Sequence, residues 1–287
     1  MKFRVVVASQ MAALAIPAQL TANEQKSESS QRSDFIVLDA PDISHTSKPF
    51  KSPATEGWFY TWMGVFAFLF CVAAFGPSIV HPERRLGPIT PLVAVHGIVF
   101  FAWLLLFGAQ TILASTNLAV HRRMGLWSAI LAAALVLLGY QTTIAMGRRG
   151  YDLSGDVGVR SDPLAAIAFP LLDVFMFAVL FLAAYFYRHR SAIHKRLMLL
   201  AVTGALMPSP VAHLTGHFAF LRDKGFLTPL MLAIFLAAGA VHDRITFRRI
   251  HPVSLWIALA IFVVENLCFA VVMPSAAWHA FAAWLIR

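Results

Sequence analysis

The stretch PLVAVHGIVFFAWLLLFGAQTILA at residues 91–114 contains no Asp, Glu, Lys or Arg. It exceeds the roughly 20 residues that an α-helix needs to cross the hydrocarbon core of a bilayer. A helix on the surface of a water-soluble protein keeps one polar face, and this stretch has too few polar residues to form one. The stretch therefore predicts a transmembrane helix.

Similar apolar stretches lie on both sides of it, separated by short polar connections. Hydrophobic residues make up 59% of the chain and charged residues 13%, compared with roughly one-quarter charged residues in soluble domains. The sequence predicts an all-α fold: an integral membrane bundle of about seven transmembrane helices that forms one domain, residues 57–273. Pro163, Pro229 and Pro252 mark expected helix starts, where the missing N–H of proline has no cost. The expected spans are 57–80, 91–114, 124–146, 163–187, 195–218, 226–241 and 253–273.

The two ends of the chain differ from the bundle. Residues 1–56 begin with an apolar segment that has features of a signal peptide, because Lys2 and Arg4 precede it, and they continue as a polar tail that we expect to be flexible. Residues 274–287 carry Trp278, Phe281 and Trp284 at intervals of three, which predicts a short interfacial helix.

Basic residues in the connections bear on orientation. We call the membrane side on which the first span ends side A, and the side on which it begins side B. Both sides carry basic residues, and Lys26, Arg32, Lys48 and Lys51 add to side B. Because cytoplasmic loops are enriched in Lys and Arg, this favours a cytoplasmic side B, whereas a cleaved signal peptide would favour the reverse orientation.

Four histidines form two candidate pairs for a cofactor. His121 and His194 lie at the side B starts of the third and fifth spans, and His96 and His213 lie near side A in the second and fifth spans. The positive end of a helix dipole keeps a histidine neutral, as a metal ligand must be. Histidines on different helices can ligate haem iron in the way b-type membrane cytochromes do. The pattern favours a haem- or metal-binding membrane redox protein, with haem b or a transition metal as cofactor.

A second arrangement would use His96, His213 and His217 to bind a metal. His213 and His217 are four residues apart and therefore share one helix face. If the second and fifth spans touch, three imidazoles meet at similar depth, and this ligand set suits Zn or Cu. Hydrogen bonding between helices is the alternative explanation for these three histidines.

Polar side chains within the spans support an alternative function. Gln110, Asp173 and Glu265 lie inside apolar stretches, where an ionisable side chain costs on the order of 3 kcal/mol unless it is paired or protonated. His96, Trp103 and Gln110 recur at intervals of seven, so they share a face that we expect to point into the bundle. These residues favour a proton-linked transporter or channel-like protein with a polar path.

The net charge of +9 supports a third function. In a soluble protein it would suggest nucleic acid, but here the basic residues lie in loops, which predicts contact with membrane lipids and no nucleic-acid partner. This favours a non-catalytic, lipid-binding subunit of a larger membrane complex, or a homo-oligomer. No nucleophile–base motif, phosphate loop or dinucleotide fingerprint occurs, so the sequence leaves open whether the protein is an enzyme. The candidates for binding a lipid headgroup or another anion are Arg122, Lys195, Arg196 and His251.

One stretch resembles a known family. His96-Gly97, Phe100-Phe101, Trp103, Gln110-Thr111, His121-Arg122 and Gly125 are spaced as in a bacterial family of multi-pass membrane proteins of unknown function, and the later block His194-Lys195-Arg196-Leu197-Met198 is similar too. The resemblance covers roughly residues 57–273. It implies a multi-pass protein of the bacterial cytoplasmic membrane and singles out His96, Gln110, His121 and His194 without giving them a role. His213 departs from the pattern, so a three-histidine site is not implied by the resemblance.

Overall fold

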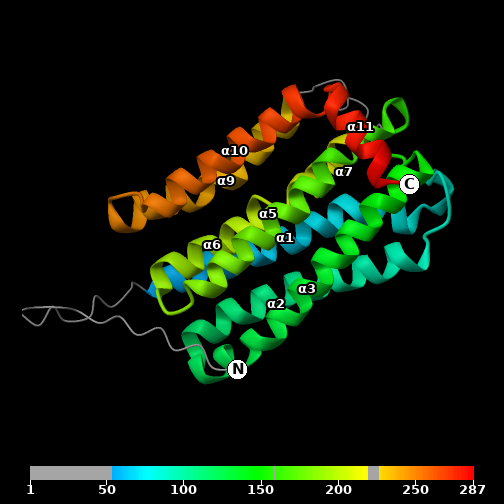
Figure 1. The fold of residues 1–287 in the computed structure, drawn as a ribbon. Helices are drawn as coiled ribbons and strands as arrows, with labels where there is room; N and C mark the ends of the chain where they lie inside the picture. Colours follow the sequence, from blue (N-terminus) through cyan, green and yellow to red (C-terminus); the bar gives the residue numbers. More distant parts are fainter. Residues whose placement is uncertain (1–53, 158, 219–225) are drawn as a thin grey trace, which may run out of the picture. The chain divides into compact units, whose positions relative to one another are not determined.

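The computed structural model describes residues 54–157, 159–218 and 226–287 (Figure 1). The chain divides into two units, Met1–Lys51 and Ser52–Arg287, and every described residue belongs to the second. The signal peptide and flexible tail predicted for residues 1–56 therefore lie outside the described residues, except for 54–56.

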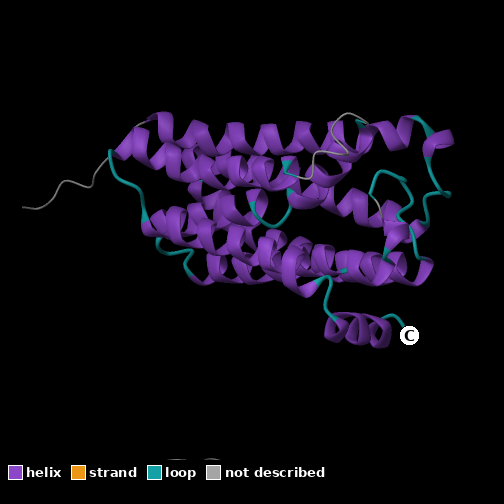
Figure 2. Cartoon of the chain, turned by 90° about the horizontal axis from the view of Figure 1, so that it is seen from above, coloured by secondary structure: helices purple, strands orange, loops and turns teal. Residues whose placement is uncertain are grey.

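The described part of the chain contains helices and no strand (Figure 2). Seven helical segments are long and apolar enough to cross a membrane, which confirms the predicted all-α membrane bundle. Four of these spans are single helices: α1 (Ala54–Val80), α2 (Pro91–Thr116), α3 (Leu118–Arg149) and α9 (Leu227–Phe247). The fourth span consists of α4 (Pro163–Ala166) and α5 (Ala168–Phe186), and the fifth of α6 (Ser191–Thr203) and α7 (Pro208–His217). The seventh consists of the π-helical turn η4 (Val253–Ile257), α10 (Ala258–Leu267) and the π-helical turn η5 (Cys268–Val272).

Shorter elements lie outside the spans. The connection between α1 and α2 contains the 3-10 turn η2 (Pro82–Arg84), and the connection after α3 contains the 3-10 turn η3 (Val159–Ser161). The chain ends in α11 (Ala276–Leu285), a separate short helix that contacts α4 and lies beside the spans in Figure 2. The helix predicted within residues 274–287 is therefore present.

Local chemistry fixes where the helices begin. The side chains of Thr90, Asn117 and Asp162 accept hydrogen bonds from N–H groups in the first turns of α2, α3 and α4. Pro163 begins α4 as predicted, while α9 begins at Leu227, ahead of the predicted start at Pro229.

The fifth span is a broken helix rather than the continuous helix predicted for residues 195–218. α6 ends at Thr203 and α7 begins at Pro208. Pro208 opposes a continuous helix at this point, because proline lacks an N–H and its ring collides with the carbonyl group four residues earlier. Residues 204–207 are all buried, as non-helical backbone at membrane depth must be. Of the residues in the most apolar stretch of this span, 72% are buried inside the bundle, compared with 17–44% in the other spans.

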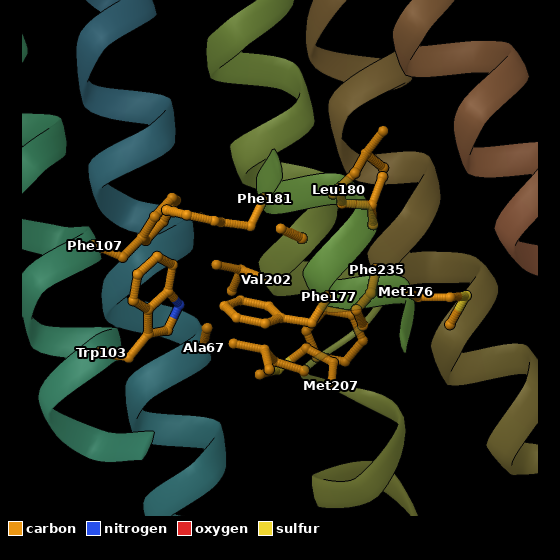
Figure 3. Close-up of a cluster of buried hydrophobic side chains, with 14 of the residues drawn as sticks. Ala67, Trp103, Phe107, Met176, Phe177, Leu180, Phe181, Val202, Met207 and Phe235 are labelled. Atoms are coloured by element: carbon orange, nitrogen blue, oxygen red, sulfur yellow. The ribbon is translucent and has the colours of Figure 1, made fainter. Parts of the chain in front are cut away.

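A core of large apolar side chains holds the helices together. Trp103 of α2 packs edge-on against Phe177 and Phe181 of α5, with ring centroids 5.2 and 5.4 Å apart. Figure 3 shows Trp103 facing Phe177 and Val202 across the interior of the bundle. Edge-to-face packing of this kind stabilises an aromatic cluster beyond the area that it buries.

Five helices form a closed ring of contacts. α1 contacts α2, α2 contacts α3, α3 contacts α5, α5 contacts α7, and α7 contacts α1. α9 packs against α6, α7 and α10, and α9 and α10 run side by side in Figure 1. A cavity lies inside this ring.

Candidate functional site

A cavity of about 800 Å³ is lined by residues of these five helices and of two side A connections. Its wall is mostly apolar and includes Phe75, Phe100 and Phe177. Ligand pockets in proteins commonly measure about 300–1,000 Å³ and combine apolar walls with a few polar groups. We call it the side A cavity. Its polar lining residues are Ser78, Arg85, His96, Thr142, Thr143, Arg149, Asp152, Ser154, Asp173, Ser209 and His213.

The structure brings the predicted pair His96 and His213 to this one cavity. His96 belongs to α2 and His213 to α7, two helices that both contact α1. The ring of His213 packs against Phe75, with ring centroids 4.8 Å apart. Nδ1 of His96 is buried and has no hydrogen-bond partner among the described residues. Two imidazoles from different helices are therefore available to a ligand in the cavity.

The connection after α3 orients the ring of His213. Oγ of Ser154 lies 3.2 Å from Nδ1 of His213, and Oδ2 of Asp156 lies 3.6 Å from the same atom. Burial raises the pKa of Asp156, but hydrogen bonds from His213 and Ser154 outweigh it and hold the pKa below its ordinary value. A carboxylate at this position favours a proton on Nδ1 and a lone pair on Nε2, which is the form of histidine that binds a metal.

The described residues do not assemble the predicted metal site of His96, His213 and His217. Nδ1 of His217 lies 2.8 Å from Oδ1 of Asp156, and Nε2 lies 3.0 Å from the carbonyl oxygen of Ala74. Both ring nitrogens of His217 are thus engaged in hydrogen bonds between α7, α1 and the connection after α3. No group of three or more His, Cys, Asp or Glu side chains within the described ranges is arranged to hold a metal ion.

Two arginines bring guanidinium groups to the side A cavity, whose lining also includes Asp152 and Asp173. Arg85 comes from the connection between α1 and α2, and Arg149 is the last residue of α3. Nε of Arg149 donates to the carbonyl oxygen of Tyr151 at 3.1 Å, and Nε of Arg85 is buried without a partner in the described structure. Sequence reasoning missed both arginines as site residues. The available signal was their position beside the ends of two spans.

The predicted side B pair, His121 and His194, also comes together. The ring centroids lie 6.4 Å apart and the ring planes are nearly perpendicular, at 81°. Nδ1 of His121 lies 3.2 Å from the carbonyl oxygen of Gln110, and Nδ1 of His194 lies 2.8 Å from the carbonyl oxygen of Ala184. At His194 the backbone carbonyl oxygen accepts from Nδ1, which fixes the ring and its tautomer and leaves Nε2 for a ligand.

Gln110 belongs to this side B pair and does not line the side A cavity. In the amide orientation that gives both ends of its side chain a hydrogen-bond partner, Nε2 of Gln110 donates to Nδ1 of His121 at 2.7 Å. Oε1 of Gln110 then accepts from Oγ of Ser128 at 3.1 Å. The inward-pointing face predicted for α2 thus serves two separate sites. The polar path predicted from His96, Asp173 and Gln110 together does not form in one cavity.

The two predicted intramembrane carboxyl groups are neighbours. Asp173 of α5 and Glu265 of α10 are 8% and 2% exposed. Their side chains are within hydrogen-bonding reach of each other. Asp173 lines the side A cavity, whereas Glu265 lies behind it and is not part of the wall.

A buried ion pair organises side B. Nε of Arg196 donates to Oδ2 of Asp243 at 3.0 Å, and Nη2 of Arg196 donates to Oδ1 of Asp243 at 2.5 Å. Oδ2 of Asp243 also accepts from Oγ of Ser254 at 2.6 Å and from the backbone N–H of His251 at 3.2 Å. The carboxylate therefore joins α6, α9 and η4 through charge-assisted hydrogen bonds.

This network changes the interpretation of the predicted anion-binding residues. Arg196 is 5% exposed and its guanidinium group binds Asp243, so it is a structural residue and not a lipid contact. The Nζ of Lys195 lies over the rings of Tyr60 and Phe247, 5.7 and 5.9 Å from the centroids. Burial is the main cause that lowers the pKa of His251, and the charge of Arg196 adds to it. Of the four predicted residues, Arg122 is the exposed one.

Comparisons of the chain with protein-family models, with curated proteins and with solved structures found no match. The resemblance to a bacterial family of multi-pass membrane proteins therefore stays a prediction.

Proposed function

We propose that the protein is a b-type haem redox protein of the bacterial cytoplasmic membrane, with one haem site near each membrane side. The observation that carries the proposal is the pairing of the histidines. His96 and His213 line one cavity near side A, and His121 and His194 are neighbours near side B. Each pair joins two helices, and two imidazoles would be enough to hold a haem iron.

The lining of the side A cavity supports the proposal of a haem there. A haem is an apolar macrocycle with two carboxylate arms, and the cavity combines an apolar wall with the guanidinium groups of Arg85 and Arg149. Arginine binds carboxylates through paired N–H donors, so these two residues would hold the propionates. The hydrogen bond at Nδ1 of His213 would raise the basicity of the Nε2 ligand. Bound haem would supply one-electron chemistry.

The distance between the rings of the side B pair supports the proposal that both could bind one metal. A metal–imidazole bond is about 2.0–2.1 Å long. Two such bonds, together with the distance from each nitrogen to its ring centre, account for the 6.4 Å between the centroids of His121 and His194. Two centres on opposite sides would let the protein pass electrons across the membrane. As partners we propose membrane lipids and a larger membrane complex or a second copy of the chain.

The test is visible absorbance and iron analysis of protein purified from membranes of cells supplied with a haem precursor. We expect two haems per chain, with loss of one in His213→Ala and loss of the other in His194→Ala. The exposed histidines His81 and His189 provide matched controls, whose alanine variants should keep both haems. A colourless, iron-free preparation would contradict the proposal, as would a haem content that neither pair variant changes.

A second candidate is a proton-linked transporter, which the broken fifth span favours. Transporters bind substrates where discontinuous helices meet near the middle of the bilayer. Ala205, Leu206 and Ser209, at the break between α6 and α7, line the side A cavity. In proteoliposomes, this function predicts proton-driven uptake of apolar carboxylates that is lost in Asp173→Asn and in Glu265→Gln. Unchanged uptake in both variants would exclude a role for the carboxyl pair.

A further inference from the structure

Asp173 and Glu265 form an acid pair in the interior of the bundle. Asp173 lies in α5 and Glu265 in α10, more than one turn from either end of the spans that contain them. Both side chains are more than nine-tenths buried, with exposures of 8% and 2%. An isolated ionised carboxylate is strongly disfavoured at such a position, and two adjacent carboxylates are disfavoured further by their mutual repulsion.

The oxygens of this pair lack hydrogen-bond donors. Oδ1 of Asp173 and both carboxyl oxygens of Glu265 are buried without a partner among the described residues. No Lys, Arg or His side chain in the described structure forms an ion pair with either carboxyl group. Since the two groups lie within hydrogen-bonding reach of each other, a proton on one of them supplies the missing donor.

The side A cavity gives this pair a route to water. Asp173 lines the cavity, and the cavity extends to residues of the side A connections, among them Arg85 and Asp152. Glu265 does not line the cavity and interacts with Asp173, which does. The other titratable or charged groups around the pair are Cys268 of η5, which interacts electrostatically with both carboxyl groups, and the cavity residues His96 of α2, His213 of α7, Arg149 of α3, and Arg85 and Asp152 of the connections.

We infer that Asp173 and Glu265 form a proton-binding site that shares one proton at neutral pH and exchanges protons with side A through the cavity. The negative charge that remains on the pair can take up a second proton. If the cavity holds haem, which rests on the proposed function, the ionised carboxylate of the pair would take up one proton from side A whenever an external one-electron reductant adds a negative charge to the cavity, so that one electron and one proton would enter together.

Infrared spectroscopy of the purified protein tests the proton site without any cofactor. We expect the carbonyl band of a protonated carboxyl group at neutral pH, a shift of that band in D2O, and its loss in the double variant Asp173→Asn/Glu265→Gln. The amides of that variant can hydrogen-bond to each other, so it should keep the fold. Asn266→Gln is the matched control, because Asn266 adjoins Glu265 but is exposed on the outside of α10. A wild-type protein without the band, or a band that survives in the double variant, would overturn the proposal.

A redox titration tests the coupling separately. With one proton per electron, the midpoint potential of the side A haem should fall by about 59 mV per pH unit, which is a tenfold change in proton concentration for a one-electron couple. The slope should disappear in the double variant and persist in Asn266→Gln. A slope that the double variant keeps would overturn the coupling. Absence of haem would contradict the proposed function, and the infrared result would still decide the proton site.

Discussion

Asp243 is the residue on which the side B network depends. Its carboxylate binds the guanidinium group of Arg196, the hydroxyl group of Ser254 and the backbone N–H of His251. Asp243→Ala would leave the Arg196 charge buried without a partner, and breaking a buried pair in this way costs about 3–5 kcal/mol. We expect a large loss of stability in denaturant unfolding of the purified protein in mild detergent.

Two variants sharpen this prediction. Arg244→Ala removes an exposed neighbouring charge and should leave stability nearly unchanged. Replacing both partners, in Arg196→Met/Asp243→Leu, should recover much of the loss, because an apolar pair of similar volume is often as stable as a buried ion pair. Equal stability of Asp243→Ala and the wild type would show that the ion pair contributes nothing.

Single residues differ in how far the sequence predicts them. Asp173 and Glu265 stand out because burying a carboxyl group in an apolar membrane span costs free energy, so such residues usually have a function. Asp156 does not stand out: it lies in a polar connection, and its importance arises only when the fold brings His213 and His217 to it. The pairing of Arg196 with Asp243 also depends on contact between α6 and α9, so charge and sequence position alone misplace Arg196 at a lipid surface.

At the scale of elements, Gly216 sets the fit between α7 and the connection after α3. A Cβ atom at Gly216 would lie 2.1 Å from the backbone oxygen of Asp156. Gly216→Ala must therefore move α7 away from Asp156, and we expect a loss of about 1–3 kcal/mol, which is typical of overpacking. Thermal unfolding measures the effect, and haem content should fall with it because His213 loses its orientation.

Gly108→Ala is the control for this substitution. A Cβ atom there meets nothing within 4 Å, and Gly108 lies inside α2. Replacing a helical glycine without a clash should raise stability slightly, by up to about 1 kcal/mol, because the unfolded chain loses freedom. If both glycine variants behave alike, close approach at Gly216 is not what limits the fold.

The docking of α11 should depend on pH. Nε2 of His279 lies 2.9 Å from Oδ2 of Asp162, and Nδ1 lies 2.9 Å from the carbonyl oxygen of Ser275. The carbonyl oxygen of Ser275 and then the carboxylate of Asp162 raise the pKa of His279 above its ordinary value of 6.5. The N–H of Ala165 and then His279 lower the pKa of Asp162 below 3.8.

The sign of the pH effect follows from these shifts. The contribution of His279 is complete below its ordinary pKa and is lost as the pH rises through the raised value. The contribution of Asp162 is lost as the pH falls through its lowered value. We expect amide hydrogen exchange in α11, corrected for the intrinsic rate, to be slowest at mildly acidic pH and faster at alkaline pH. The alkaline increase should vanish in His279→Ala, and an identical increase in that variant would contradict the assignment.

Most element boundaries were predictable because each depends on a local feature. Apolar length fixes the spans, and proline with a preceding polar side chain fixes several starts. The break between α6 and α7 was missed, although Pro208 and Pro210 lie directly after it. Their effect depends on whether the bundle can bury the interrupted backbone, and that is a property of the neighbouring helices.

For the whole molecule, the bilayer as solvent makes the fold class predictable and the arrangement unpredictable. Lipid requires every spanning segment to satisfy its own backbone, so seven apolar stretches imply seven helical spans. Lipid does not decide which helices touch. The ring of α1, α2, α3, α5 and α7 places His96 and His213 at one cavity. Neither the contacts of this ring nor the presence of Arg85 and Arg149 in the cavity can be predicted from apolar length or from periodicity.

The interrupted fifth span bears on how the chain enters the membrane during synthesis. Its mean hydropathy of 1.6 is modest, and most of its surface faces protein in the finished bundle. Alone in the translocon it would expose the interrupted backbone of residues 204–207, which is only partly hydrogen-bonded within the span, to acyl chains, a state that the bilayer strongly disfavours. Spans one to four must therefore already be present to receive it, so a ribosome paused before this segment should hold a four-helix intermediate competent for its insertion.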